Sequence, residues 1–199
     1  MVEHDNSYKL LFSHAEMVRD LLLGFVKEEW VQKLDLESLE RVSGSYVSDD
    51  IRDRHDDIVW RVKWGGEWLY VYILIEFQST IDIYMPLRVL VYVGLLYQDL
   101  IREKKLGPSG KLPAVLPVVL YNGSRRWDKS TELWDLIEDV PGGLSQYRPR
   151  FTFLLLDEGA YRDEDLKPVK NLVSALFRLE NSRDPERIRE VVKIGRAHV

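Results

Sequence analysis

The segment from residue 57 to residue 78 constrains the fold more than any other part of this sequence. Residues 57–64 alternate polar and apolar side chains and end at the pair Gly65-Gly66. Glycines supply the positive φ that a tight hairpin turn requires. Residues 68–78 follow and are largely apolar on both faces, which is typical of a buried central strand. The segment therefore predicts an antiparallel hairpin whose second strand lies inside a sheet.

The turn also predicts which side chains share a face of this hairpin. Pairing Trp64 with Glu67 places Asp57 opposite Leu74 and diagonally across from Glu76. Diagonal neighbours are about 7–8 Å apart, so two carboxylates at these positions can reach a single cation. A slip of one residue in the pairing would move Asp57 to the opposite face. A shared face for the two acids is therefore a prediction about register.

Structural explanations of these acids stand beside the functional one. Asp56 and Asp57 could form a solvated acidic start of a strand, as charge runs usually do. Glu76 could be the buried partner of an arginine, such as Arg61 or Arg88. Burial of an unpaired carboxylate is costly, so Glu76 requires either a metal or a guanidinium.

Composition excludes several classes of protein. The chain has 199 residues, of which 45% are hydrophobic, and it has no cysteine. Its length predicts one domain, and the absence of cysteine excludes a disulfide scaffold and zinc-thiolate chemistry. The net charge of −5 provides no overall basic field for nucleic acid, so a polyanion would need a local basic patch or a metal.

The two ends of the sequence suggest where the protein acts and how far its domain extends. The start MVEHDNSYK lacks the features of a signal peptide, and no stretch is long and apolar enough for a membrane span, which predicts a cytoplasmic protein. We interpret residues 1–193 as one domain that is truncated at its C-terminus. Residues 194–199, IGRAHV, resemble a translated sequencing adapter and are interpreted as a non-native tail.

Periodicity elsewhere predicts an α/β domain in which helices flank a mixed sheet. Pro86 suits the first turn of a helix, and Gly107 follows its basic last turn. The expected helices span residues 6–26, with a break near 13–16, and residues 85–104 and 163–179. The expected further strands span residues 39–47, 114–121 and 151–156, the last followed by Asp157.

Five sequence runs, in this order, resemble the recombination-promoting nuclease family, whose members are also called YhgA-like transposases of the PD-(D/E)XK type. The runs are HDNSYKLLFS, RHDDIVWRV, IEFQS, MPLRVLVY and LPVVLYNG, and the resemblance covers the first four fifths of the chain. It implies a restriction-endonuclease-like core and DNA cleavage that depends on Mg²⁺ or Mn²⁺. The family's motif aspartate corresponds to Asp57, and its E-x-Q element corresponds to Glu76 and Gln78.

The resemblance gives each of these residues an expected role. Asp57 and Glu76 would hold the metal, and Gln78 would position the attacking water. Most related nucleases have lysine where this chain has Gln78, and an amide offers only a dipole where lysine offers a charge. Lys9 lies one helical turn after Asp5 in the first run, and we hypothesise that it replaces the missing cation.

Three hypotheses follow for the function. The first is a magnesium-dependent DNA endonuclease, a phosphodiester hydrolase linked to recombination or transposition. The second is a non-catalytic DNA- or protein-binding module that keeps the nuclease fold, which the acidity of the chain and Gln78 favour. The third is an unrelated α/β interaction domain. The sequence does not fix the preferred DNA or the oligomeric state.

Overall fold

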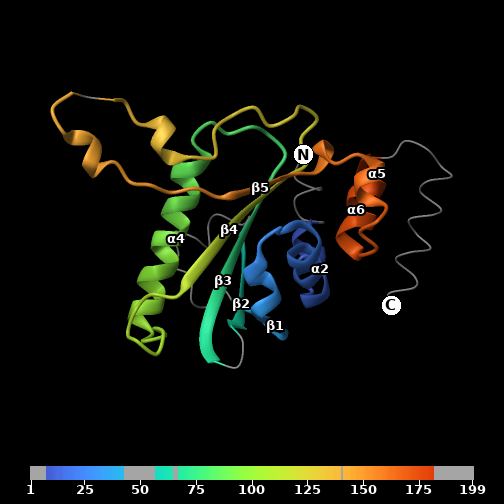
Figure 1. Cartoon of the computed structure of the whole chain (residues 1–199), viewed down its shortest axis with the longest axis horizontal. Helices are drawn as coiled ribbons and strands as arrows, with labels where there is room; N and C mark the ends of the chain where they lie inside the picture. The colour runs from blue at the N-terminus through green and yellow to red at the C-terminus, as the bar shows by residue number, and fades with distance from the viewer. Residues whose placement is uncertain (1–7, 43–56, 65–66, 140, 182–199) are drawn as a thin grey trace.

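One five-stranded sheet organises the computed structural model, which describes residues 8–42, 57–64, 67–139 and 141–181 (Figure 1). The strands lie in the order in which they occur along the chain, with the first three antiparallel and the last three parallel. They are β1 (Leu34–Arg41), β2 (Asp57–Trp64), β3 (Glu67–Gln78), β4 (Ala114–Tyr121) and β5 (Leu154–Asp157). The sheet is mixed and β3 is central, as the apolar faces of that strand predicted.

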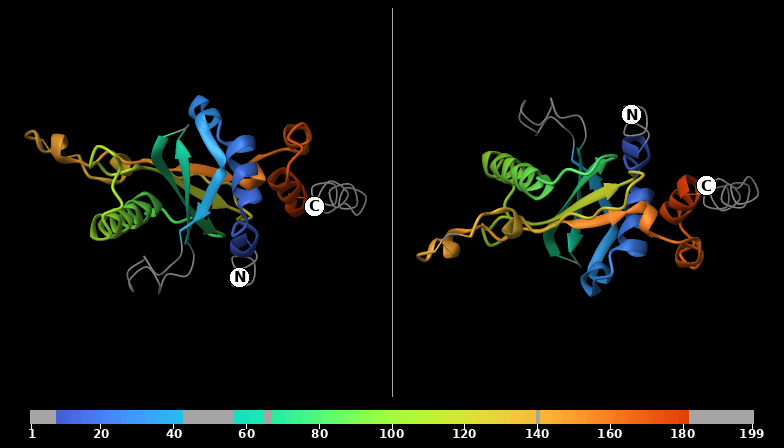
Figure 2. Two further views of the ribbon diagram at one scale, coloured as in Figure 1. Left: turned by 90° about the horizontal axis from the view of Figure 1, so that it is seen from below. Right: turned by 90° about the horizontal axis from the view of Figure 1, so that it is seen from above.

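Helices cover both faces of this sheet, so the α/β prediction is confirmed. Helix α4 packs on one face, whereas α2 and α6 lie on the other (Figures 1 and 2). The longer helices are α2 (Ala15–Phe25), α4 (Met85–Arg102) and α6 (Leu172–Asn181), and α5 (Asp163–Leu166) is a single turn. Short 3₁₀ turns are η1 (Glu29–Lys33), η3 (Leu133–Leu136), η4 (Leu144–Tyr147) and η5 (Glu158–Ala160).

This layering produces apolar clusters on both faces of the sheet. On the α2 side, alternate residues of β3 such as Ile73, Ile75 and Phe77 pack with Leu21 and Phe177. On the α4 side, a smaller cluster forms from Met85, Val89 and Tyr92 of the helix and Val119 of β4. Alternate residues of a strand face opposite sides, so Glu76 and Gln78 lie on the α4 side.

The β2–β3 register differs from the expected one in a way that preserves the shared face. Trp64 pairs with Glu67 as predicted, but the ladder shifts directly afterwards, and Lys63 pairs with Tyr70. The predicted pairing of Asp57 with Leu74 is therefore wrong, and Asp57 lies directly opposite Glu76. The shift is two residues, and side chains alternate with a period of two, so the positions of the two acids remain on one face.

The predicted first strand was misplaced. Strand β1 begins at Leu34, five residues before the predicted start at residue 39, and its last residue is Arg41. Leu34 is buried opposite Trp64, while Leu36 and Leu39 pack against the same core, so tertiary packing determines the strand position. Residues 43–47 of the prediction lie outside the described residues.

The helix predictions are correct in position but not at every boundary. The first helical segment is broken as expected, into residues 8–11 and α2. Helix α4 ends before Lys104, which takes the left-handed conformation with φ 57°, so Gly107 is not the residue that terminates it. The predicted helix 163–179 divides into α5 and α6 around Pro168, which has no backbone N–H to donate.

None of the helices in the described part of the chain combines the length and the apolar character that a membrane-spanning segment requires.

Candidate active site at the carboxyl edge of the sheet

The carboxyl ends of three parallel strands meet at one edge of the sheet. Gln78 of β3 pairs with Tyr121 of β4, and Tyr121 pairs with Asp157 of β5. Strand β2 runs antiparallel to β3 and begins at this edge with Asp57. Polar groups beyond the carboxyl ends of strands are a common place for ligand sites in α/β proteins.

Glu76 is the most buried acid at this edge, with an exposed fraction of 0%. Its Oε1 atom accepts a hydrogen bond from Nε2 of Gln78 at 2.8 Å and a second from Nη2 of Arg88. Its Oε2 atom is buried and has no hydrogen-bond partner among the described residues. Of the two kinds of partner that the sequence allowed for Glu76, a metal or a guanidinium, the structure shows the guanidinium of Arg88.

Arg88 reaches Glu76 from the first turns of α4 and is held from three sides. Its Nη1 lies 3.4 Å from Oδ2 of Asp82, and its Nε donates to the hydroxyl of Tyr92 at 3.0 Å. Burial alone would lower the pKa of Arg88, but the Glu76 carboxylate and the Tyr92 hydroxyl raise it above its ordinary value. The guanidinium therefore stays charged. The other candidate, Arg61, pairs with Glu40 at 2.7 Å.

The remaining site residues named from the sequence are placed less completely. Asp57 lies opposite Glu76 by backbone register, and its side chain is outside the described part of the structure. Lys9 is half-buried in the helical segment 8–11. The adjacent Tyr8 packs on Phe77, with ring centroids 6.2 Å apart, on the sheet face opposite Glu76. Catalytic roles for Asp57, Glu76, Gln78 and Lys9 therefore stay predictions.

The donor chemistry of the edge fits a hard divalent cation. Magnesium is commonly held by one or two carboxylates, with waters and substrate phosphates completing its coordination. Oε2 of Glu76, which has no partner among the described residues, and Asp57, which lies across the ladder, would provide such a pair. Among the described side chains, no group of three or more His, Cys, Asp or Glu could hold a metal. A metal site formed by Asp57 and Glu76 therefore stays a prediction.

A second acid at the same edge was not predicted as part of an ion pair. Asp157 accepts a hydrogen bond from Nη1 of Arg126 at 2.5 Å on one oxygen and from the backbone N–H of Trp127 at 2.9 Å on the other. Arg126 also donates to the carbonyl of Gly123. A Cβ atom on Gly159 would lie 2.0 Å from Nη1 of Arg126, so the glycine makes room for the guanidinium. The sequence signal was an acid that directly follows a buried strand.

A buried acid also lies on the opposite side of this edge. The hydroxyl of Tyr8 donates to the carboxylate of Glu158, and the exposed fractions of the two residues are 2% and 3%. Burial raises the pKa of Glu158 to about 7, although the Tyr8 hydrogen bond opposes this shift. Burial also raises the pKa of Tyr8. Tyr8 lies in the first motif run, but nothing in the sequence identifies its partner.

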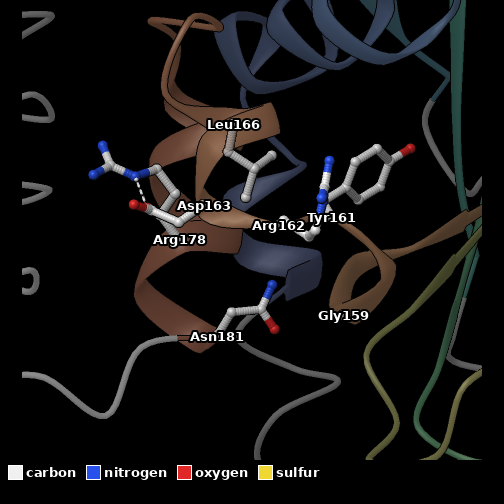
Figure 3. Close-up of a pocket in the computed structure, with 7 residues that line it drawn as sticks. All are labelled: Gly159, Tyr161, Arg162, Asp163, Leu166, Arg178 and Asn181. Atoms are coloured by element: carbon white, nitrogen blue, oxygen red, sulfur yellow. Dashed lines mark hydrogen bonds and ion pairs between the residues drawn. The ribbon is translucent and has the colours of Figure 1, made fainter.

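The polar cavity in Figure 3 contains none of the predicted site residues. It has a volume of about 290 Å³ and lies between η5, α5 and α6, lined by Tyr161, Leu166 and Arg178, among others. Nε of the buried Arg178 donates to Asp163 at 2.7 Å, and this contact lowers the pKa of Asp163 (Figure 3). The ion pair joins α5 to α6, so it has a structural explanation within the cavity wall.

Comparison with known proteins identifies the family. The sequence profile of the family described as "Putative transposase, YhgA-like" matches residues 2–193. The chain belongs to this YhgA-like family. The resemblance inferred from the five sequence runs is therefore confirmed.

Curated members of the YhgA-like family resemble the chain at moderate identity. Recombination-promoting nuclease RpnD of Escherichia coli O157:H7 is 35% identical over 122 residues, which are 61% of this chain and 46% of that protein. RpnA of Escherichia coli K12, also named a recombination-promoting nuclease, is 31% identical over 60% of this chain and 40% of its own length. The chain therefore spans about half the length of these relatives.

Other YhgA-like relatives carry names that mark them as inactive. The protein named inactive recombination-promoting nuclease-like protein RpnE, from Escherichia coli K12, is 24% identical over 96% of this chain and 62% of its own length. YjiP of the same strain, named "Putative inactive recombination-promoting nuclease-like protein", is 35% identical over 45% of this chain and 86% of its own length. No solved structure matches the chain significantly.

Proposed function

We propose that this YhgA-like protein is a magnesium- or manganese-dependent DNA endonuclease that hydrolyses phosphodiester bonds during recombination or transposition in the cytoplasm. The observation that carries the proposal is the position of Asp57 directly opposite the buried Glu76, whose Oε2 lacks a hydrogen-bond partner in the described structure. Relatives named recombination-promoting nucleases support the same reaction class. DNA is the proposed substrate.

The proposed mechanism assigns each side chain a separate task. Asp57 and Glu76 would hold the metal, and a bound Mg²⁺ ion would supply a water of lowered pKa and a charge that clamps the phosphate. Gln78 fixes Oε1 of Glu76 through its amide nitrogen, which leaves its amide oxygen to accept a hydrogen bond from the attacking water. The water oxygen bonds to phosphorus and releases a proton to solvent, the bond from phosphorus to one sugar oxygen breaks, and that oxygen takes up a proton from solvent.

A non-catalytic DNA- or protein-binding module is the second candidate, and one contact favours it. Arg88 already neutralises Glu76, so the buried carboxylate does not require a metal for its stability. The relatives named as inactive are consistent with a fold that is retained after its chemistry is lost. This alternative predicts a folded protein that binds its partner and does not cleave DNA.

A plasmid-nicking assay distinguishes the two candidates. Supercoiled plasmid is incubated with wild type, Asp57→Ala and Asp57→Asn, in Mg²⁺, Mn²⁺ or EDTA, and the fold of each variant is checked by thermal denaturation. The endonuclease proposal predicts nicking by wild type in either metal, none in EDTA and almost none by the variants. Equal nicking by wild type and Asp57→Ala would refute the site. Plasmid binding without nicking would favour the module.

A further inference from the structure

The guanidinium of Arg88 lies between a fully buried acid and solvent. The exposed fraction of its side chain is 29%, whereas that of the Glu76 side chain is 0%. A guanidinium has five N–H donors. Three of them point to Glu76, Asp82 and Tyr92 in the described structure. One N–H remains on each terminal nitrogen, and these two donors have no hydrogen-bond partner among the described residues.

A purely structural partner would explain only part of this arrangement. Burying Glu76 without a counter-charge would be costly, and Arg88 meets that requirement. However, Arg88 binds one oxygen of Glu76 and leaves the other without a partner among the described residues, and its side chain, with two unused donors, is 29% exposed. An N–H group of a charged guanidinium is a strong donor to a phosphate oxygen. The geometry therefore suits an anion that approaches Glu76 from solvent.

We propose that Arg88 is a catalytic residue that contacts the scissile phosphate and provides the positive charge that Gln78 lacks. This inference rests on the proposed nuclease function. Arg88 would stabilise the negative charge that builds up on the phosphate oxygens during attack. It takes this role in preference to Lys9, because Arg88 contacts Glu76 directly, whereas Lys9 belongs to a helical segment that packs on the other sheet face.

Arg102 provides a matched control on the same helix. It is 14 residues further along α4, about 21 Å away at 1.5 Å per residue. It also pairs with a buried acid, Asp99, at 2.5 Å, and one oxygen of Asp99 likewise lacks a partner among the described residues. Arg102→Gln therefore removes the same charge from a similar ion pair at a distance from Glu76.

The test compares Arg88→Gln, Arg88→Lys and Arg102→Gln in three measurements. Nicking of plasmid in Mg²⁺ should fall about 10²–10³-fold in Arg88→Gln, recover partly in Arg88→Lys and change little in Arg102→Gln. The affinity for a fluorescent DNA duplex is measured in EDTA at several salt concentrations. The slope of log affinity against log salt concentration should decrease by about one phosphate contact in Arg88→Gln alone. Mn²⁺ titration calorimetry should show unchanged or tighter binding in Arg88→Gln, since a competing cation is removed from Glu76.

The measurements distinguish a failure of the nuclease proposal from a failure of the Arg88 proposal. If wild type does not nick, the proposed function fails, and the salt dependence still decides whether Arg88 contacts phosphate. If wild type nicks and Arg88→Gln nicks equally well, the inference about Arg88 fails while the nuclease stands. A lower melting temperature in Arg88→Gln with an unchanged salt dependence would show that Arg88 only stabilises Glu76, and this too would overturn the inference.

Discussion

Two acids at the same edge of the sheet each hold an arginine, but they leave different groups available. Asp157 has both oxygens occupied, one by Arg126 and one by the backbone N–H of Trp127. Glu76 is more deeply buried, yet its Oε2 has no hydrogen-bond partner in the described structure. A carboxylate whose two oxygens both accept hydrogen bonds holds the surrounding chain in place. A carboxylate with an unpartnered oxygen can also accept a ligand.

The two arginines join different parts of the molecule. Arg126 donates to the carbonyl of Gly123 and lies against the bare backbone of Gly159, so its contacts join the turn after β4 to the end of β5. Arg88 reaches its acid from a helix on the sheet face, and its side chain is less exposed than that of Arg126, 29% against 46%. Because only Glu76 has an oxygen without a partner, we propose that the Asp157 pair serves stability and the Glu76 pair serves chemistry, a division that substitution can test.

The largest expected effect is a loss of nicking in Glu76→Gln. If Glu76 holds the metal as proposed, the loss of its carboxylate should lower the nicking rate about a thousandfold while preserving side-chain volume. Asp157→Asn should instead lower the free energy of unfolding by about 1–3 kcal/mol, because a charged hydrogen-bond acceptor is lost. Nicking kinetics and urea denaturation measure the two effects. Loss of nicking in a fully folded Asp157→Asn protein would contradict the division.

The pH dependence of stability tests a third acid at this edge, Glu158, whose hydrogen bond comes from the neutral Tyr8. Its pKa is about 7 in the folded protein and 4.5 in the absence of burial. The unfolded chain therefore loses this proton first as pH rises, and stability should fall between pH 4.5 and 7 by on the order of 2–3 kcal/mol. Urea denaturation at pH 4.5 and 8 measures it.

Glu158→Gln provides the control for this pH effect. The variant cannot ionise at that position, so its free energy of unfolding should not show this part of the decline with pH. The stability of the variant relative to wild type should therefore be greater at pH 8 than at pH 4.5. The same pH dependence in wild type and variant would show that Glu158 does not titrate in this range.

The glycine beside Arg126 offers a smaller effect. Gly159→Ala would push the guanidinium away from Asp157, and we expect unfolding to become about 1–2 kcal/mol easier because that ion pair is lost. Gly94→Ala is the matched control, since a Cβ there meets nothing within 4 Å inside α4 and should stabilise the helix by about 0.5–1 kcal/mol. If Gly159→Ala and Gly94→Ala changed the melting temperature in the same direction, this explanation of Gly159 would be wrong.

The smallest expected effect comes from an exposed pair of the same chemistry. Arg61 and Glu40 lie 2.7 Å apart across β1 and β2, with exposed side-chain fractions of 25% and 60%. Glu40→Gln should change the free energy of unfolding by only about 0.2–1 kcal/mol, and less in high salt. Denaturation in 0.05 M and 1 M NaCl checks this limit. If Glu40→Gln lowered the free energy of unfolding as much as Asp157→Asn, burial of the acid would not explain the difference between the two ion pairs.

Sequence reasoning placed the two acids of the candidate site on one face because strand parity survives an error of register of two residues. The glycine pair predicted the turn and the pairing of Trp64 with Glu67, but not the irregularity that follows. A bulge depends on the local fit between two strands, which a turn sequence does not encode. The error amounted to two residues, so Asp57 and Glu76 kept a common face.

The partners of these acids were harder to predict. Arg61 and Arg88 were equally plausible for Glu76, because the choice depends on how α4 rotates against the sheet. Arg126 lies 31 residues from Asp157. Such pairs are created by tertiary packing, and no periodicity in the sequence records them.

Contacts between distant segments also affect the order in which the chain can fold during synthesis. Tyr8 and Glu158 are 150 residues apart, and the backbone N–H of Leu172 donates to Asp20 across 152 residues. Phe25 packs on Phe177, with ring centroids 4.9 Å apart. Contacts of this length form slowly and leave apolar surface uncovered in the meantime. A ribosome must therefore complete almost all of the described chain before its first helices acquire their final neighbours.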